Sequence, residues 1–123
     1  MGTLQVKADT ASNRLNVKMT GYSDASEMVE QVSRVVAELP KLRPGWVMIS
    51  DLSEMKATTP GGAAALEKAM KAYKQSGIAR IVRIVGADVI GKMQMQRLAK
   101  EAGIQVEYVT SAAEAEALLK AKP

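Results

Sequence analysis

The chain has 123 residues, a length typical of one domain, and 47% of them are hydrophobic, which is enough for one core. Cysteine and histidine are absent, which excludes disulfides, thiolate chemistry and imidazole bases or ligands, so we expect a non-enzymatic protein without a metal or cofactor. The net charge of +4 is spread along the chain without a Lys/Arg block, which indicates a mildly basic surface and argues against nucleic-acid binding.

The first two predicted elements form a hairpin. Apolar and polar residues alternate over 4–8 and again over 15–19, and a polar stretch joins the two runs. This period of two is typical of strands. Lys7, Asn16 and Lys18 fall on the alternate face, so we expect a half-solvated pair at one edge of a sheet.

The next elements are a helix and a buried strand. Asp24 and Glu27 match a capping box, apolar residues then recur at helical spacing as far as Leu39, and Pro40 ends the pattern. Residues 46–50 are nearly all apolar, as in a central strand covered on both faces, and Trp46 is expected to pack in the core or against the hairpin. We expect a polar loop over 51–58.

The second half alternates helix and strand. Thr59 and Pro60 predict the start of a helix that runs to about residue 76, and strands are expected at 78–85 and 104–109. A third helix lies between these strands and ends near Gly103, and Thr110 or Ser111 caps a fourth. The order β-β-α-β-α-β-α-β-α predicts a single α/β domain over 1–123, with a mixed five-stranded sheet and right-handed crossovers.

The start of the second helix has two interpretations. Thr at the N-cap followed by Pro at the first helical position is ordinary helix-start chemistry, and we favour this structural interpretation. The alternative is a binding site, because adjacent hydroxyls, the glycines Gly61 and Gly62 and free N–H groups at a positive helix end suit an anion or phosphate. Asp51 and Ser53 lie at the preceding strand exit. We favour a structural role for them, in which their side chains bond nearby backbone N–H groups of a turn, over a binding role.

The third helix carries more apolar residues than one buried stripe needs. Its packed face is expected to comprise Gly91, Met95, Leu98, Ala99 and Ala102. Ile90, Met93 and Arg97 project from the opposite side, and they are either scattered surface residues or a patch for a partner or ligand. The strand before this helix is otherwise apolar but contains Arg80 and Arg83. Either one end of the strand lies near the surface, or an arginine pairs with an acid such as Asp51 or Glu107.

The element order, the Asp-Leu-Ser exit at 51–53 and the small-residue helix start at 58–62 together resemble the STAS domain, the family of sulfate transporters and anti-sigma factor antagonists. The closer likeness is to divergent stand-alone bacterial members, and it extends from the hairpin to the last helix. The resemblance implies a STAS-like sheet with about four helices mainly on one face.

The same resemblance implies a function. In anti-sigma factor antagonists, a Ser or Thr in an Asp-Ser-Ser-Gly-like segment at this helix start is phosphorylated by a partner kinase, which switches binding to an anti-sigma factor. If Gly61 matches the motif glycine, Thr59 is the phosphoacceptor, and Thr58 and Ser53 are the other candidates. Thr58 then replaces the motif Asp, and Pro60 replaces the second hydroxyl residue.

We therefore predict a regulatory protein-interaction domain whose partner is an anti-sigma factor or its kinase. The alternative function is a carrier that holds a small apolar or anionic ligand in a pocket made adaptable by eight methionines. Residues 1–7 lack a signal-peptide core and no apolar run approaches the ~20 residues of a membrane helix, so a cytoplasmic location without a membrane span is expected. The half-polar hairpin and the pair Ile90 and Met93 each permit a homodimer.

Overall fold

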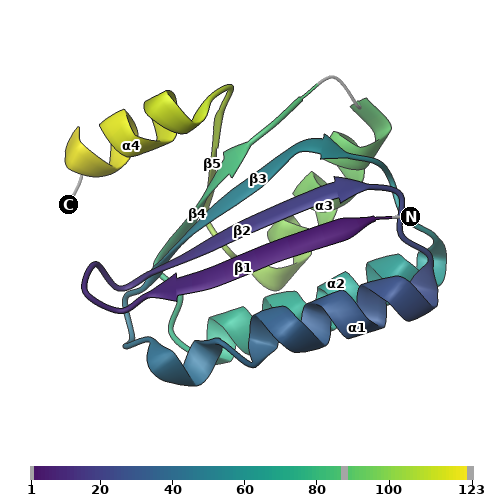
Figure 1. The fold of residues 1–123 in the computed structure, drawn as a ribbon, viewed down its shortest axis with the longest axis horizontal. Helices are drawn as coiled ribbons and strands as arrows, with labels where there is room; N and C mark the ends of the chain where they lie inside the picture. The colour runs from purple at the N-terminus through teal and green to yellow at the C-terminus, as the bar shows by residue number, and fades with distance from the viewer. Residues whose placement is uncertain (1, 87–88, 122–123) are drawn as a thin grey trace.

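The computed structural model describes residues 2–86 and 89–121, with side chains left undescribed at 89–92 and 121. Its centre is one five-stranded sheet with the strand order β1-β2-β3-β4-β5 (Figure 1). Only β1 and β2 are antiparallel, and every later neighbour pairs in parallel. The strands are β1 (Thr3–Asp9), β2 (Arg14–Gly21), β3 (Val47–Met55), β4 (Arg80–Ile84) and β5 (Val106–Val109).

Helices cover the two faces of the sheet unequally. The helices are α1 (Ala25–Val36), α2 (Pro60–Gln75), α3 (Val89–Ala102) and α4 (Ala112–Ala121), with a short 3-10 turn over Leu39–Lys41. Helices α1, α2 and α3 lie on one face, whereas α4 lies on the other (Figure 1). The predicted fold class, a mixed sheet with the helices mainly on one face, is therefore confirmed.

Two apolar clusters hold the layers together. The larger fills the space between the sheet and α1, α2 and α3, and it includes Trp46, which is fully buried as predicted. The smaller joins α4 to the opposite face of β4 and β5 through residues such as Ala115 and Leu119. Because α4 reaches only this part of the sheet, the outer faces of β1 and β2 stay more open, and Lys7 and Asn16 are exposed there.

The predicted helix signals are confirmed at several ends. The Glu27 N–H donates to the Asp24 carboxylate at 2.9 Å, and the Asp24 N–H donates to Glu27 at 3.1 Å, which completes the capping box. Ser111, one of the two proposed caps of the last helix, accepts from the Glu114 N–H at 3.1 Å. Gly77 and Gly103 adopt positive φ just beyond α2 and α3, as expected of residues that end helices.

Several predicted boundaries were wrong, and the strands expected at 78–85 and 104–109 comprise only Arg80–Ile84 and Val106–Val109. The first helix ends at Val36, before Pro40, and the chain reaches the proline through the 3-10 turn. The expected loop over 51–58 is mostly strand, because β3 continues to Met55. The physical reason is pairing with β2, which extends to Gly21 opposite Met55 and satisfies the backbone of this polar segment.

No helix in the part of the chain that the structure describes is long and apolar enough to span a membrane.

Candidate functional site

The start of α2 is held by hydrogen bonds within its own first turn, to the backbone just before α1 and to a side chain of α3. The Gly62 N–H donates to the Thr59 hydroxyl at 3.0 Å, so Thr59 is the N-cap that the sequence predicts. The neighbouring Thr58 hydroxyl donates to the carbonyl of Ser23 at 2.7 Å, just before α1. The Gln94 side chain of α3 forms two hydrogen bonds with the Thr58 backbone, accepting from its N–H at 3.1 Å and donating to its carbonyl at 3.2 Å. We call this pair of bonds the Gln94 clasp.

Both glycines of this segment have a packing reason. A Cβ on Gly61 would lie 2.8 Å from the Cβ of Ala25, so the absence of a side chain lets the starts of α1 and α2 approach each other. A Cβ on Gly62 would lie 2.0 Å from the Thr58 hydroxyl oxygen, which is fixed by its bond to Ser23. The structural interpretation of these glycines gains support, and a role in binding stays a prediction.

A hollow of about 340 Å³ lies between the first turns of α2 and the C-terminal half of α3. Arg97 lines it from α3, and Pro60, the residue after the Thr59 cap, lines it from α2. Met93 lies one helical turn before Arg97 on α3, and 62% of its surface is exposed. We call this region the α2–α3 surface, and its residues are Thr59, Pro60, Ala63, Glu67, Met93, Arg97 and Glu101.

Asp51 and Ser53 do not join this surface. The Asp51 carboxylate accepts from the Ser53 N–H at 3.1 Å and from the Ser53 hydroxyl at 2.7 Å, so the predicted local hydrogen bonding is present, although within β3 and not in a turn. Asp51 lines a different hollow of about 320 Å³ on the sheet face beside α4. The predicted site residues are thus divided between two faces of the molecule.

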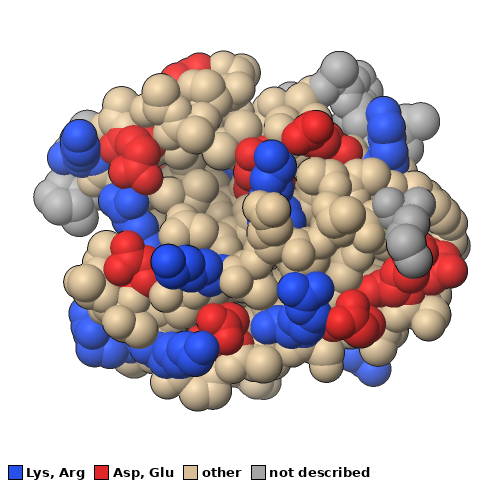
Figure 2. Space-filling view, in the orientation of Figure 1, with Lys and Arg blue, Asp and Glu red and all other residues tan. Residues whose placement is uncertain are grey.

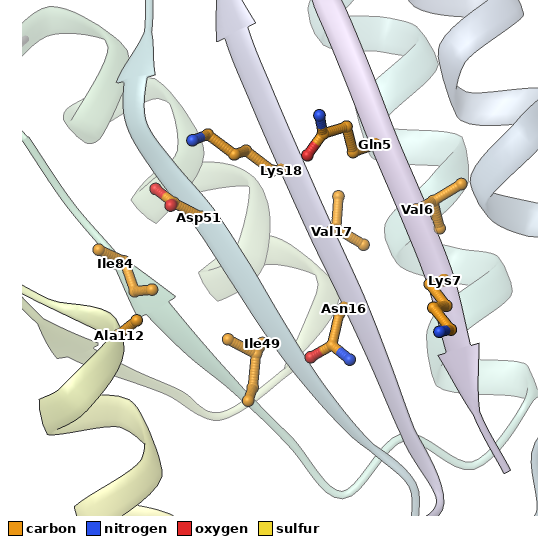
Figure 3. A pocket seen from close by; sticks show the side chains of 10 residues that line it. All are labelled: Gln5, Val6, Lys7, Asn16, Val17, Lys18, Ile49, Asp51, Ile84 and Ala112. Atoms are coloured by element: carbon orange, nitrogen blue, oxygen red, sulfur yellow. The ribbon is translucent and has the colours of Figure 1, made fainter.

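The hollow beside α4 combines apolar and charged side chains. Figure 3 shows Ile49, Ile84 and Ala112 gathered at one end, whereas the Lys18 side chain extends toward Asp51. Lys18 forms an ion pair with Glu54 at 3.3 Å. Basic and acidic side chains alternate over this side of the molecule without segregating by sign (Figure 2). A small-ligand carrier, the alternative function, stays a prediction.

Three further points concern Ile90, Gln94 and metal binding. The Ile90 side chain lies outside the described part of the structure, so the prediction that Ile90 projects beside Met93 stays a prediction. No sequence pattern predicts the hydrogen bonds between Gln94 and the Thr58 backbone, because the two residues are 36 positions apart. No group of three or more Asp or Glu that could hold a metal ion occurs among the described residues.

Comparison with solved structures finds proteins of similar fold. A DUF3478-family protein with a SpoIIAA-like fold from Shewanella loihica PV-4 matches with a TM-score of 0.71 and 13% identity, over 96% of this chain and 93% of that one. An anti-sigma factor antagonist from Mycobacterium paratuberculosis matches at 0.56 and 17% identity, over 98% and 95% of the two chains. The chain therefore has a STAS-like fold, as the sequence resemblance predicted.

The same fold also occurs inside a larger protein of another kind. An ATP citrate lyase from Methanosaeta concilii matches 99% of this chain, with a TM-score of 0.63 and 13% identity, but the match spans only 40% of the lyase. At such identities the likeness establishes the fold alone. No protein-family model matches the chain, and no curated protein matches it.

Proposed function

We propose that this chain is a non-enzymatic regulatory domain, similar in role to an anti-sigma factor antagonist, and that it binds a protein partner through the α2–α3 surface. The observation that carries the proposal is that Pro60 of the capped α2 start and Arg97 of α3 line one hollow, while exposed Met93 lies one helical turn before Arg97. Methionine and arginine are enriched in protein interfaces, and methionine adapts its shape to a partner. The fold that this chain shares with anti-sigma factor antagonists supports the choice of partner class.

Thr59 is the hydroxyl best suited to a phosphorylation switch. It lies at the N-terminus of α2, where the helix dipole and the first-turn N–H groups stabilise added negative charge, and Arg97 lines the adjoining hollow. Thr58 is less suited, because its hydroxyl is bonded to the Ser23 carbonyl and faces Gly62 closely. Ser53 is also less suited, because its hydroxyl donates to the Asp51 carboxylate, which would repel a phosphate.

The experiment is a phosphorylation and binding assay with the purified anti-sigma-factor kinase encoded in the source genome. We expect the kinase to bind the unmodified chain, to label Thr59 when ATP is added, and then to bind at least about tenfold more weakly, since a phosphate adds nearly two negative charges to the interface. Mass spectrometry locates the label, and isothermal titration calorimetry measures the two affinities.

Two variants control this assay. Thr59→Ala is expected to abolish labelling, whereas Ser53→Ala, which changes a hydroxyl outside the α2–α3 surface, is expected to be labelled like the unchanged protein. Labelling that survives Thr59→Ala would rule out Thr59 as the acceptor. Absence of both labelling and binding would overturn the proposed function.

A further inference from the structure

Arg83 is the most deeply buried charged side chain described in the molecule. It lies in β4 beside Ser50 of β3 and Tyr108 of β5, and only 2% of its surface is exposed. Strand alternation directs Arg83 to the same face as Ile81, which belongs to the core under α1, α2 and α3. The sequence did not decide whether Arg80 or Arg83 pairs with an acid. Of the two, only Arg80 forms a described ion pair, with Glu107 at 2.7 Å.

The guanidinium of Arg83 is incompletely satisfied. Its Nε and Nη1 atoms are buried and have no hydrogen-bond partner, and no described carboxylate forms an ion pair with it. Its polar contacts with aromatic side chains are a hydrogen bond with Tyr108 and an electrostatic interaction with Tyr73. Burial raises the pKa of Tyr73 far above its ordinary value, so this phenol stays neutral. A buried guanidinium without a counter-charge is costly, and burial accordingly lowers the pKa of Arg83.

Tyr108 provides the route to this group. Its ring lies over the guanidinium, with 6.0 Å from the Arg83 Cζ to the ring centroid, and 38% of Tyr108 is exposed. Strand β5 is at the edge of the sheet, and its residue Tyr108 is the register partner of Arg83 on that side. Rotation of the Tyr108 side chain would break its hydrogen bond to the guanidinium, which the oxygens of a bound ligand would replace, and would admit that ligand without opening the core.

We propose that Arg83 is the anchor of a buried binding site for a small oxyanion, such as phosphate or a carboxylate, with Tyr108 as its cover. The oxygens of such an anion accept from both Nε and Nη1, and its charge compensates the guanidinium. Ser50, buried on the neighbouring strand beside Arg83, adds a hydroxyl within the same layer. This site is separate from the α2–α3 surface and does not depend on the proposed function.

The test is a titration of the isotope-labelled chain with inorganic phosphate, and separately with acetate, at constant ionic strength. NMR follows the arginine Nε–Hε signals, and Arg83 is assigned as the signal that Arg83→Met or Arg83→Lys removes. We expect a saturable shift of the Arg83 signal with at least one of the two anions, and a rise in the melting temperature that saturates over the same concentrations.

The variants separate this site from general ion effects. Arg83→Met is expected to weaken the anion response at least about tenfold, whereas Arg34→Met, which removes an exposed arginine of α1, is expected to keep it. If Arg83→Met does not fold, Arg83→Lys replaces it. The titration of the unchanged chain tests anion binding at Arg83 without any variant. An Arg83 signal that stays fixed with both anions, or an equal thermal response in the Arg83 and Arg34 variants, would overturn the proposal.

Discussion

Replacing Trp46 by alanine is expected to lower the free energy of unfolding by about 3–5 kcal/mol, the range for removing a large aromatic side chain from a core. Trp46 is fully buried, and its ring packs edge-to-face on Tyr73 of α2, with 5.9 Å between ring centroids. It also immediately precedes β3, where its carbonyl accepts from the Ala79 N–H at 2.7 Å. The substitution would leave a cavity between α2 and the start of the central strand.

A matched variant separates ring packing from polarity. The indole Nε1 of Trp46 is buried without a hydrogen-bond partner, so Trp46→Phe keeps an aromatic ring against Tyr73 and removes an unsatisfied donor. We expect this variant to lose only about 1–2 kcal/mol. Urea denaturation should be followed by circular dichroism, because Trp46 is the only tryptophan in the chain. Equal losses in the two variants would contradict the packing described here.

Gly86→Ala is expected to cost about 3 kcal/mol, at the upper end for overpacking, because the added Cβ meets backbone that cannot rotate away. That Cβ would lie 2.0 Å from the carbonyl oxygen of Ser53 and 2.8 Å from its carbonyl carbon. The close approach holds the carboxyl ends of β3 and β4 together, and β3 leads directly into the segment before α2. Gly86→Ala should therefore disturb the start of α2 as well as stability.

Gly45→Ala is the matched control for this steric argument. Gly45 has φ +91°, and a Cβ there would have no heavy atom within 4 Å, so the variant adds conformational strain without a collision. We expect it to cost about 1–2 kcal/mol. Thermal and urea unfolding of the two variants under one set of conditions gives the comparison. A Gly86 variant as stable as the Gly45 variant would show that the strand exits can separate.

Local sequence patterns predicted most of the fold. Alternation defined the hairpin, the Asp24–Glu27 pair defined the start of α1, and Thr59 with Pro60 defined the start of α2. These signals succeed because each depends on residues close together in the chain. The end of β3 was missed because its polar residues resemble a loop, and only pairing with β2 at Gly21 makes them strand.

The arrangement of the candidate site depended on contacts that sequence patterns do not contain. Arg97 was predicted to project from α3, but its place in one hollow with Pro60 follows from how α2 and α3 pack. The clasp of Gln94 on Thr58 joins residues 36 positions apart, and the orphaned guanidinium of Arg83 follows from which strands flank β4. Spacing along the chain could not specify these tertiary relationships.

The central claim, that the α2–α3 surface binds a protein partner, is tested most directly by one calorimetric titration against the purified anti-sigma-factor kinase of the source genome. The titration compares Met93→Glu with Val29→Glu, which places the same charge at a residue of similar exposure on α1, 62% against 58%. We predict that Met93→Glu weakens binding at least about tenfold and that Val29→Glu leaves it unchanged. Equal affinities for the two variants, or a larger loss with Val29→Glu, would contradict the assignment of this surface.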